Sequence, residues 1–103
     1  MEVIDNITDA PIDKITNAPI DTFIIIYKDT CPYCRAALQK LRDDGKSYKG
    51  YDIAHQPFTK DQLLTILKEN RSKIYFNVSH TTFPMIFLNG RFIGGYDQLL
   101  ANY

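Results

Sequence analysis

The chain has 103 residues, the size of one domain, and hydrophobic residues make up 45% of it, enough for a packed core. Its 12 basic and 12 acidic residues cancel, which argues against a surface for nucleic acid. The longest apolar run, residues 23–27, is far shorter than the roughly 20 residues that span a bilayer, so we expect no membrane partner. The first residues lack a signal-peptide pattern, so we expect a reducing, cytoplasmic compartment.

Residues 1–21 differ from the rest of the chain and carry a tandem octapeptide repeat. Residues 7–14, ITDAPIDK, are followed directly by residues 15–22, ITNAPIDT. Pro11 and Pro19 are expected to interrupt any continuous helix in this segment. The sequence therefore predicts short turns or an extended N-terminal arm over residues 1–21, followed by one domain over residues 22–103.

The next segment predicts a strand, a tight turn and a helix. Residues 23–27, Phe-Ile-Ile-Ile-Tyr, favour a buried strand, and residues 32–43 favour a helix that ends at Gly45. Between them, Cys31-Pro-Tyr-Cys34 places the only two cysteines of the chain at the start of the helix. A disulfide between cysteines this close together would not be the main source of the fold's stability. In a reducing compartment their spacing is typical of a thiol–disulfide redox site.

The local geometry predicts different roles for the two cysteines. Pro32 suits the first helical position, so Cys31 becomes the N-cap residue, and its sulfur faces the free N–H groups of Tyr33 and Cys34. A thiolate is stabilised at this end of the helix dipole, which makes Cys31 the candidate nucleophile. Cys34 lies on the apolar helix face, so we expect it to be a buried resolving thiol.

The rest of the chain predicts an alternation of strands and helices. Five further elements are expected: a strand over 47–53, a helix over 59–70, two strands over 84–88 and 91–93, and a helix over 96–102. Thr59 and Gln62 form a capping box, and Asn89-Gly90 suits the turn of a hairpin, whereas residues 71–81 indicate no clear element. The order βαβαββα implies an α/β fold with helices packed on a mixed sheet.

Three motifs of this sequence resemble the glutaredoxin family of the thioredoxin-fold superfamily. They are Cys31-Pro-Tyr-Cys34 after the first strand, Thr82-Phe83-Pro84 before the third, and Gly94-Gly95-Tyr96-Asp97 before the last helix. The resemblance covers residues 22–103. It implies a thioredoxin-like, four-stranded mixed sheet of order 2-1-3-4 and a glutathione-dependent thiol–disulfide oxidoreductase. We further expect a monomer that serves electron transport without a metal.

The resemblance also implies a reaction and a set of binding residues. Cys31 attacks a protein disulfide or a glutathionylated thiol, and Cys34 resolves the mixed disulfide with a protein. Glutathione then restores the dithiol, and glutathione reductase acts only indirectly. The glutathione-binding residues implied are Lys28, Tyr33, Thr82, Phe83, Pro84, Gly95, Tyr96 and Asp97.

Each binding residue has an expected contact with the tripeptide. Phe83, before a cis Pro84, offers a backbone edge to an extended peptide. The start of the last helix offers N–H groups to the γ-glutamyl carboxylate, and Asp97 binds the neighbouring ammonium group. Lys28 pairs with the glycine carboxylate, and Tyr33 packs on the ligand.

The chain departs from the family in four places. Tyr96 stands where a small residue is common, Phe83 replaces a usual valine, residues 71–81 lengthen the approach to the third strand, and the last helix is short. The residue of the second helix that contacts glutathione is therefore left open among Lys60, Gln62 and Arg71.

Three other functions fit the sequence less well. A zinc site built from the cysteines with His55 and His80 lacks the paired histidine spacing of zinc modules. A [2Fe–2S] carrier, with a cluster shared by two protomers, is disfavoured because Pro32 stiffens the turn and Cys34 competes for Cys31. A redoxin coupled to thioredoxin reductase, such as a donor to ribonucleotide reductase, is disfavoured by the glutathione-type motifs.

Overall fold

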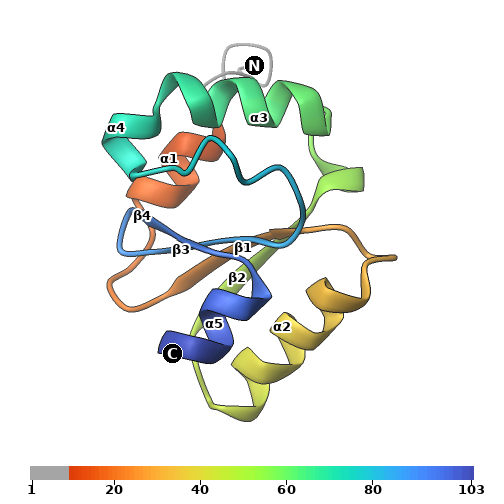
Figure 1. Cartoon of the computed structure of the whole chain (residues 1–103). Helices are drawn as coiled ribbons and strands as arrows, with labels where there is room; N and C mark the ends of the chain where they lie inside the picture. The colour runs from red at the N-terminus through yellow and green to blue at the C-terminus, as the bar shows by residue number, and fades with distance from the viewer. Residues whose placement is uncertain (1–9) are drawn as a thin grey trace.

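A four-stranded mixed sheet forms the centre of the molecule. The structure is a computed structural model that describes residues 10–103, so residues 7–9 of the repeat lie outside the described part. The strands are β1 (Phe23–Tyr27), β2 (Tyr48–Asp52), β3 (Met85–Leu88) and β4 (Arg91–Gly94). Their order is β2-β1-β3-β4, with β1 parallel to β2 and antiparallel to β3, and β3 antiparallel to β4 (Figure 1). The predicted sheet is confirmed.

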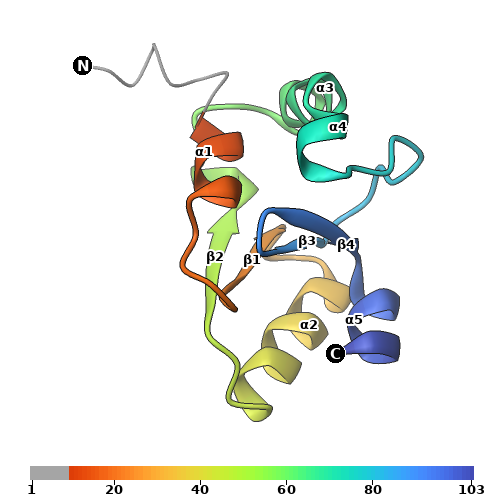
Figure 2. The same ribbon diagram turned by 90° about the vertical axis from the view of Figure 1, so that its left-hand side faces the viewer.

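Helices cover both faces of this sheet. They are α1 (Ala10–Thr16), α2 (Pro32–Asp43), α3 (Lys60–Glu69), α4 (Arg71–Ile74) and α5 (Tyr96–Asn102), with a 3-10 turn, η1, at Ile53–His55. Helices α1, α3 and α4 lie on one side of the sheet and α2 and α5 on the other (Figures 1 and 2). None of the helices from Ala10 onward is long and apolar enough to cross a membrane.

Strand β1 supplies side chains to both halves of the core. Ile24 and Ile26 pack with the buried residues of α1, α3 and α4, whereas Phe23 and Ile25 pack with α2 and α5. All four side chains are at most 3% exposed. A central strand whose alternating side chains are buried on both faces reads as an unbroken apolar run, which is why the sequence predicts it clearly.

The predicted caps and turns are present. The Thr59 hydroxyl accepts a hydrogen bond from the Gln62 N–H (3.2 Å), and the Gln62 side chain accepts one from the Thr59 N–H (2.9 Å), so the capping box of α3 is confirmed. Asn89 and Gly90 both have positive φ angles, 53° and 78°, as the predicted hairpin turn requires.

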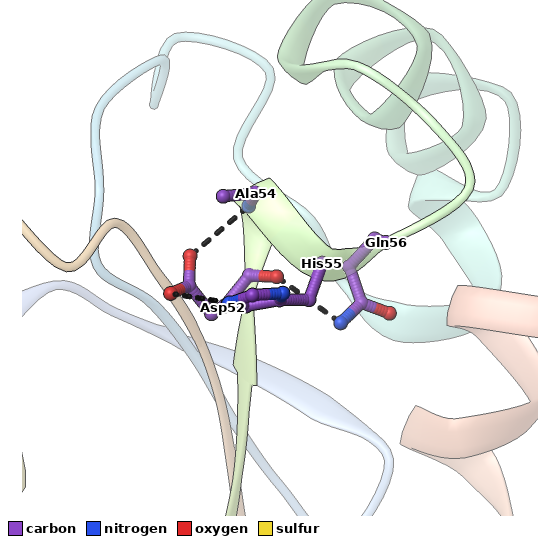
Figure 3. Close-up of polar contacts among 4 residues, drawn as sticks. All are labelled: Asp52, Ala54, His55 and Gln56. Carbon is purple, nitrogen blue, oxygen red and sulfur yellow. Dashed lines mark hydrogen bonds and ion pairs between the residues drawn. The ribbon is translucent and has the colours of Figure 1, made fainter.

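The end of β2 is fixed by one aspartate. The Asp52 carboxylate accepts a hydrogen bond from the Ala54 N–H (3.0 Å), and its backbone carbonyl accepts one from the Gln56 side chain (3.1 Å), as Figure 3 shows. His55 lies on the same turn with its Nε2 atom 3.8 Å from Asp52 Oδ2. This turn directs the chain away from the sheet toward α3.

The prediction of turns or an extended chain was wrong for residues 10–16, which form α1. Pro11 is the second residue of this helix, where its missing N–H has no intrahelical partner to lose. Ile12 and Ile15 are only 4% and 1% exposed and belong to the core. The division of the chain at residue 22 stays a prediction.

The two repeat copies adopt different structures. The motif Ala-Pro-Ile-Asp is helical in the first copy, but in the second copy Thr22 N–H bonds to the Pro19 carbonyl (3.1 Å) in a turn before β1. Asp21 there has a φ angle of 61°, and its N–H donates to the Asn89 side chain (2.8 Å). Ile20 is 82% exposed.

This difference gives a matched pair of variants. Ile12→Ala should lower the free energy of unfolding by about 2–4 kcal/mol, because it removes a buried side chain. Ile20→Ala, the same change at the equivalent repeat position, should alter it by less than about 0.5 kcal/mol. Urea unfolding of both variants measures the difference, and equal losses would contradict the packing of α1 in the core.

Candidate active site

The dithiol, Cys31 and Cys34, lies at the start of α2, after the turn that follows β1. Cys31 is the N-cap residue of α2, and Pro32 is the first residue of the helix, as predicted. The Cys31 sulfur accepts a hydrogen bond from the Cys34 N–H (3.3 Å), whereas the predicted second donor, Tyr33 N–H, does not bond to it. The turn before the helix is closed by a bond from the Cys31 N–H to the Lys28 carbonyl (3.0 Å).

The two sulfurs have different environments. Cys31 is partly exposed, whereas Cys34 is 0% exposed, and the two cysteines are not joined by a disulfide in this structure. Burial, helped by the hydrogen bond with Cys31, raises the pKa of the Cys34 thiol to about 12. Cys31 therefore carries the accessible sulfur. Cys34, one helical turn further along α2, is a buried thiol.

Alkylation should distinguish the two thiols. In the reduced protein at pH 7, iodoacetamide should modify Cys31 at least about 100-fold faster than Cys34, because Cys34 is buried and its raised pKa keeps it protonated. Modification of Cys34 should still be rising at pH 10, since its thiolate fraction grows with each pH unit up to a pKa of about 12. Mass spectrometry of peptides measures both rates, and equal rates at pH 7 would contradict this environment.

A groove of about 240 Å³ lies beside the dithiol. Its lining residues are Tyr33, His80, Thr82, Phe83, Pro84, Gly95, Tyr96, Asp97 and Gln98. The Phe83–Pro84 bond is cis, as predicted, and the Cys31 thiol lies 3.7 Å from the Phe83 carbonyl oxygen, to which it donates a hydrogen bond. This contact joins the redox centre to the groove.

Most of the residues predicted to bind glutathione line this groove, and one does not. Lys28 is exposed and lies outside the lining, as does Cys31, which reaches the groove only through Phe83. Lys60 has its Nζ atom 5.7 Å from the centre of the Phe83 ring. The two other candidates of the second helix are engaged elsewhere: Gln62 caps α3, and Arg71 bonds to the Lys68 carbonyl.

Two aromatic side chains narrow the groove. The rings of Tyr33 and Tyr96 lie 6.1 Å apart with a 39° tilt between their planes. Tyr33 is 64% exposed, so its ring is free to cover a bound ligand, whereas Tyr96 is partly buried. Tyr96, which stands where a small residue is common in the family, is one of the lining residues.

Sequence reasoning missed two residues of the lining, His80 and Gln98. The Gln98 side chain accepts a hydrogen bond from the Gly95 N–H (2.8 Å), a cap that the spacing of Gly95 and Gln98 would have predicted. His80 follows a segment without periodicity, so no local pattern indicated that its side chain lies in the groove. The two histidines do not form the zinc site that we weighed, because in residues 10–103 no group of three or more metal-ligating side chains comes together.

The fold and the site together define a class of protein. A Cys-x-x-Cys that caps the helix after a central strand, next to the cis proline that precedes the neighbouring strand in a mixed sheet of this order, is the arrangement of a thiol–disulfide oxidoreductase with a thioredoxin-like fold. The chain belongs to the glutaredoxin family, because the family model described as "Glutaredoxin" matches residues 23–93.

Relatives and solved structures agree with this assignment. A protein of Acanthamoeba polyphaga mimivirus described as "Probable glutaredoxin" is 44% identical over 78 residues, covering 76% of this chain and 74% of the viral protein. The crystal structure of the holo form of glutaredoxin C1 from Populus tremula x tremuloides has a TM-score of 0.72 at 25% identity and covers 94% of this chain and 85% of that one. A buckwheat glutaredoxin–glutathione complex has the same fold, with a TM-score of 0.73, 18% identity and coverage of 97% and 81%.

Proposed function

We propose that this chain is a glutathione-dependent oxidoreductase that reduces protein disulfides and glutathionylated thiols and so takes part in electron transport. The observation that carries the proposal is the groove beside Cys31. Phe83 lines this groove, and its carbonyl oxygen accepts a hydrogen bond from the Cys31 thiol. A tripeptide with a central cysteine fits such a site, because its sulfur has to reach Cys31 while its two ends are bound elsewhere. The solved complex of a buckwheat glutaredoxin with glutathione supports this choice of thiol.

The groove residues suggest how glutathione is held. The backbone of Phe83 pairs with the extended cysteine unit of the ligand. At the other end, Asp97 binds the γ-glutamyl ammonium group, and backbone N–H groups beside Tyr96 face the carboxylate. The glycine carboxylate lies toward two lysines. Lys28 is in the turn that leads to Cys31, and Lys60 lies over the Phe83 ring.

The proposed reaction runs through Cys31. The Cys31 thiolate attacks the glutathionyl sulfur of a mixed disulfide, which forms a Cys31–glutathione disulfide and releases the substrate thiolate. A second glutathione thiolate then attacks the glutathione sulfur on Cys31, which forms oxidised glutathione and regenerates the Cys31 thiolate. With a protein disulfide, Cys31 first forms a mixed disulfide with one protein sulfur and releases the other as a thiolate. Cys34 then loses its proton and attacks the Cys31 sulfur, which forms a Cys31–Cys34 disulfide and releases the reduced protein. Two glutathione molecules reduce this disulfide to the dithiol and leave as oxidised glutathione.

We also propose the setting in which this reaction occurs. The dithiol works as a reductant in a compartment with a reduced glutathione pool, for which the cytoplasm is our proposal. The partners are then glutathione, oxidised proteins and, through oxidised glutathione, glutathione reductase. We propose a monomer, since one chain supplies both cysteines and the whole lining of the groove.

The experiment that tests this function compares two reductants. Turnover of a glutathionylated peptide with NADPH is measured once with glutathione and glutathione reductase, and once with thioredoxin reductase. We expect turnover only with the glutathione system, saturating with glutathione. Turnover only with thioredoxin reductase would overturn the proposal in favour of a redoxin.

A further inference from the structure

His80 lines the groove beside the dithiol and has no role in the reaction described above. It comes from the loop between α4 and β3 and lines the groove together with Gly95, Tyr96 and Asp97. Its Cε1 atom lies 3.2 Å from the position that a Cβ atom would occupy at Gly95. A side chain at that position would press on the imidazole, so Gly95 makes room for His80.

The ring of His80 is held in a defined orientation. Its Nε2 atom lies 3.3 Å from the Pro84 carbonyl oxygen, and its ring packs edge-on against Phe92 with the centroids 5.0 Å apart. Because a carbonyl oxygen only accepts hydrogen bonds, Nε2 carries the proton. Protonation of the second nitrogen, Nδ1, therefore adds a charge without breaking this contact.

The Nδ1 atom is available to a ligand. Among the described residues it has no hydrogen-bond partner, and in the same part of the chain no buried side-chain nitrogen or oxygen lacks one. It follows that Nδ1 is accessible from outside the protein. In the neutral ring Nδ1 is an acceptor, and in the imidazolium it is a charged donor.

The charges of the groove complement an amino acid in its zwitterionic form. Of the described residues that line it, Asp97 is the one carboxylate and His80 the one side chain able to carry a positive charge. The Gly95 N–H is not free for an anion, because it already donates to Gln98 (2.8 Å). In a ligand end with both an ammonium and a carboxylate group, Asp97 therefore suits the ammonium group, and His80 adds a side-chain charge for the carboxylate beside the backbone N–H groups near Tyr96.

We propose that the His80 imidazolium binds the α-carboxylate of the γ-glutamyl unit through Nδ1, beside Asp97 and the ammonium group. This inference rests on the proposed function, since it names glutathione as the ligand, and it adds a specificity-determining residue to that site. The neutral ring would instead turn a lone pair toward the carboxylate. Glutathione binding is therefore coupled to protonation of His80.

The direction of the pH effect follows from this coupling. Histidine is the side chain that changes charge between pH 5 and 8, so the affinity is highest at the acidic end of this range and falls as the pH rises. The other charged or titratable groups in or beside the groove are Asp97, Tyr33, Tyr96 and Lys60. All four are retained in His80→Gln, so a pH dependence caused by any of them would persist in that variant.

The test measures binding of S-methylglutathione, which cannot react with the dithiol. By titration calorimetry, the wild-type protein should bind it about fivefold more tightly at pH 5.5 than at pH 7.5, the effect of one partly exposed charge pair. His80→Gln keeps a donor for the Pro84 carbonyl but cannot take a charge, so its affinity should not change with pH. His55→Gln, which alters the exposed histidine beside Asp52 (Figure 3), should behave like the wild type.

A second ligand identifies the group that His80 binds. The analogue 4-aminobutyryl-S-methylcysteinylglycine keeps the ammonium group and lacks the α-carboxylate, so its affinity should be the same at both pH values. Binding of S-methylglutathione with an equal pH dependence in the wild type and in His80→Gln would overturn the role of His80 and leave the glutathione site standing. No binding of S-methylglutathione at either pH would overturn the proposed function, and this inference with it.

Discussion

Cys31→Ser is expected to lower every disulfide-exchange activity of this protein by at least about 1000-fold. Cys31 is the sulfur that caps α2, accepts the Cys34 N–H and lies next to the groove. A serine hydroxyl in the same place stays un-ionised at neutral pH and forms no disulfide, so the first step of the reaction is lost. The buried Cys34 cannot replace it, because substrate sulfurs do not reach it and its raised pKa keeps it protonated.

Two assays measure this loss, one with a glutathionylated peptide and one with a protein disulfide. Thr30→Ser, a change on the exposed neighbour of Cys31, should keep both activities within about twofold of the wild type. Thermal unfolding of the serine variant should match that of the wild type within a few degrees, because serine also caps helices well. A variant that keeps more than a tenth of either activity would show that Cys31 is not the nucleophile.

The strand register explains why separate motifs meet at one site. Ile26 near the end of β1 pairs with Met85 at the start of β3, which places Pro84 at the same edge of the sheet as Cys31. Ile86 in turn pairs with Gly94 at the end of β4, so the residues that follow Gly94 emerge at this edge as well. The groove is therefore a consequence of the order β2-β1-β3-β4.

The sequence predicts the elements that have strong local signals. An unbroken apolar run gives β1, the Thr59 capping box gives the start of α3, and Asn89-Gly90 gives the hairpin. The same holds for Cys31 as N-cap residue, because proline at the first helical position fixes the register of α2. The sheet order follows less directly and depends on the resemblance to the glutaredoxins.

Features decided by tertiary packing are the ones that the sequence does not predict. Ile12 and Ile20 stand in identical Ala-Pro-Ile-Asp motifs, yet only Ile12 finds core residues of α3 and α4 to pack against, and this contact stabilises α1. A short helix has too few internal bonds to form on propensity alone. His80 is a similar case, because its orientation depends on Pro84, Phe92 and Gly95, which come from other segments.

Cys34→Ser is expected to separate the two activities of the protein. Removal of glutathione from a glutathionylated peptide needs only Cys31 and free glutathione, so its rate should stay within about threefold of the wild type. Reduction of a protein disulfide should fall by about 100-fold. Without Cys34, the mixed disulfide between Cys31 and the protein is cleaved only by glutathione from solution, which is slower. An intramolecular thiol one turn away acts at an effective concentration that solution glutathione does not match.

The buried position of Cys34 sets the control for this experiment. A hydroxyl placed where the side chain is 0% exposed destabilises the fold unless it finds a hydrogen-bond partner, so Cys34→Ala, which brings no polar group, should be measured in parallel. Both variants should lose the same activity and keep the other, since each lacks the resolving sulfur. An equal loss of both activities in two well-folded variants would contradict the division of labour, and it would mean that the mixed disulfide at Cys31 is always resolved by Cys34.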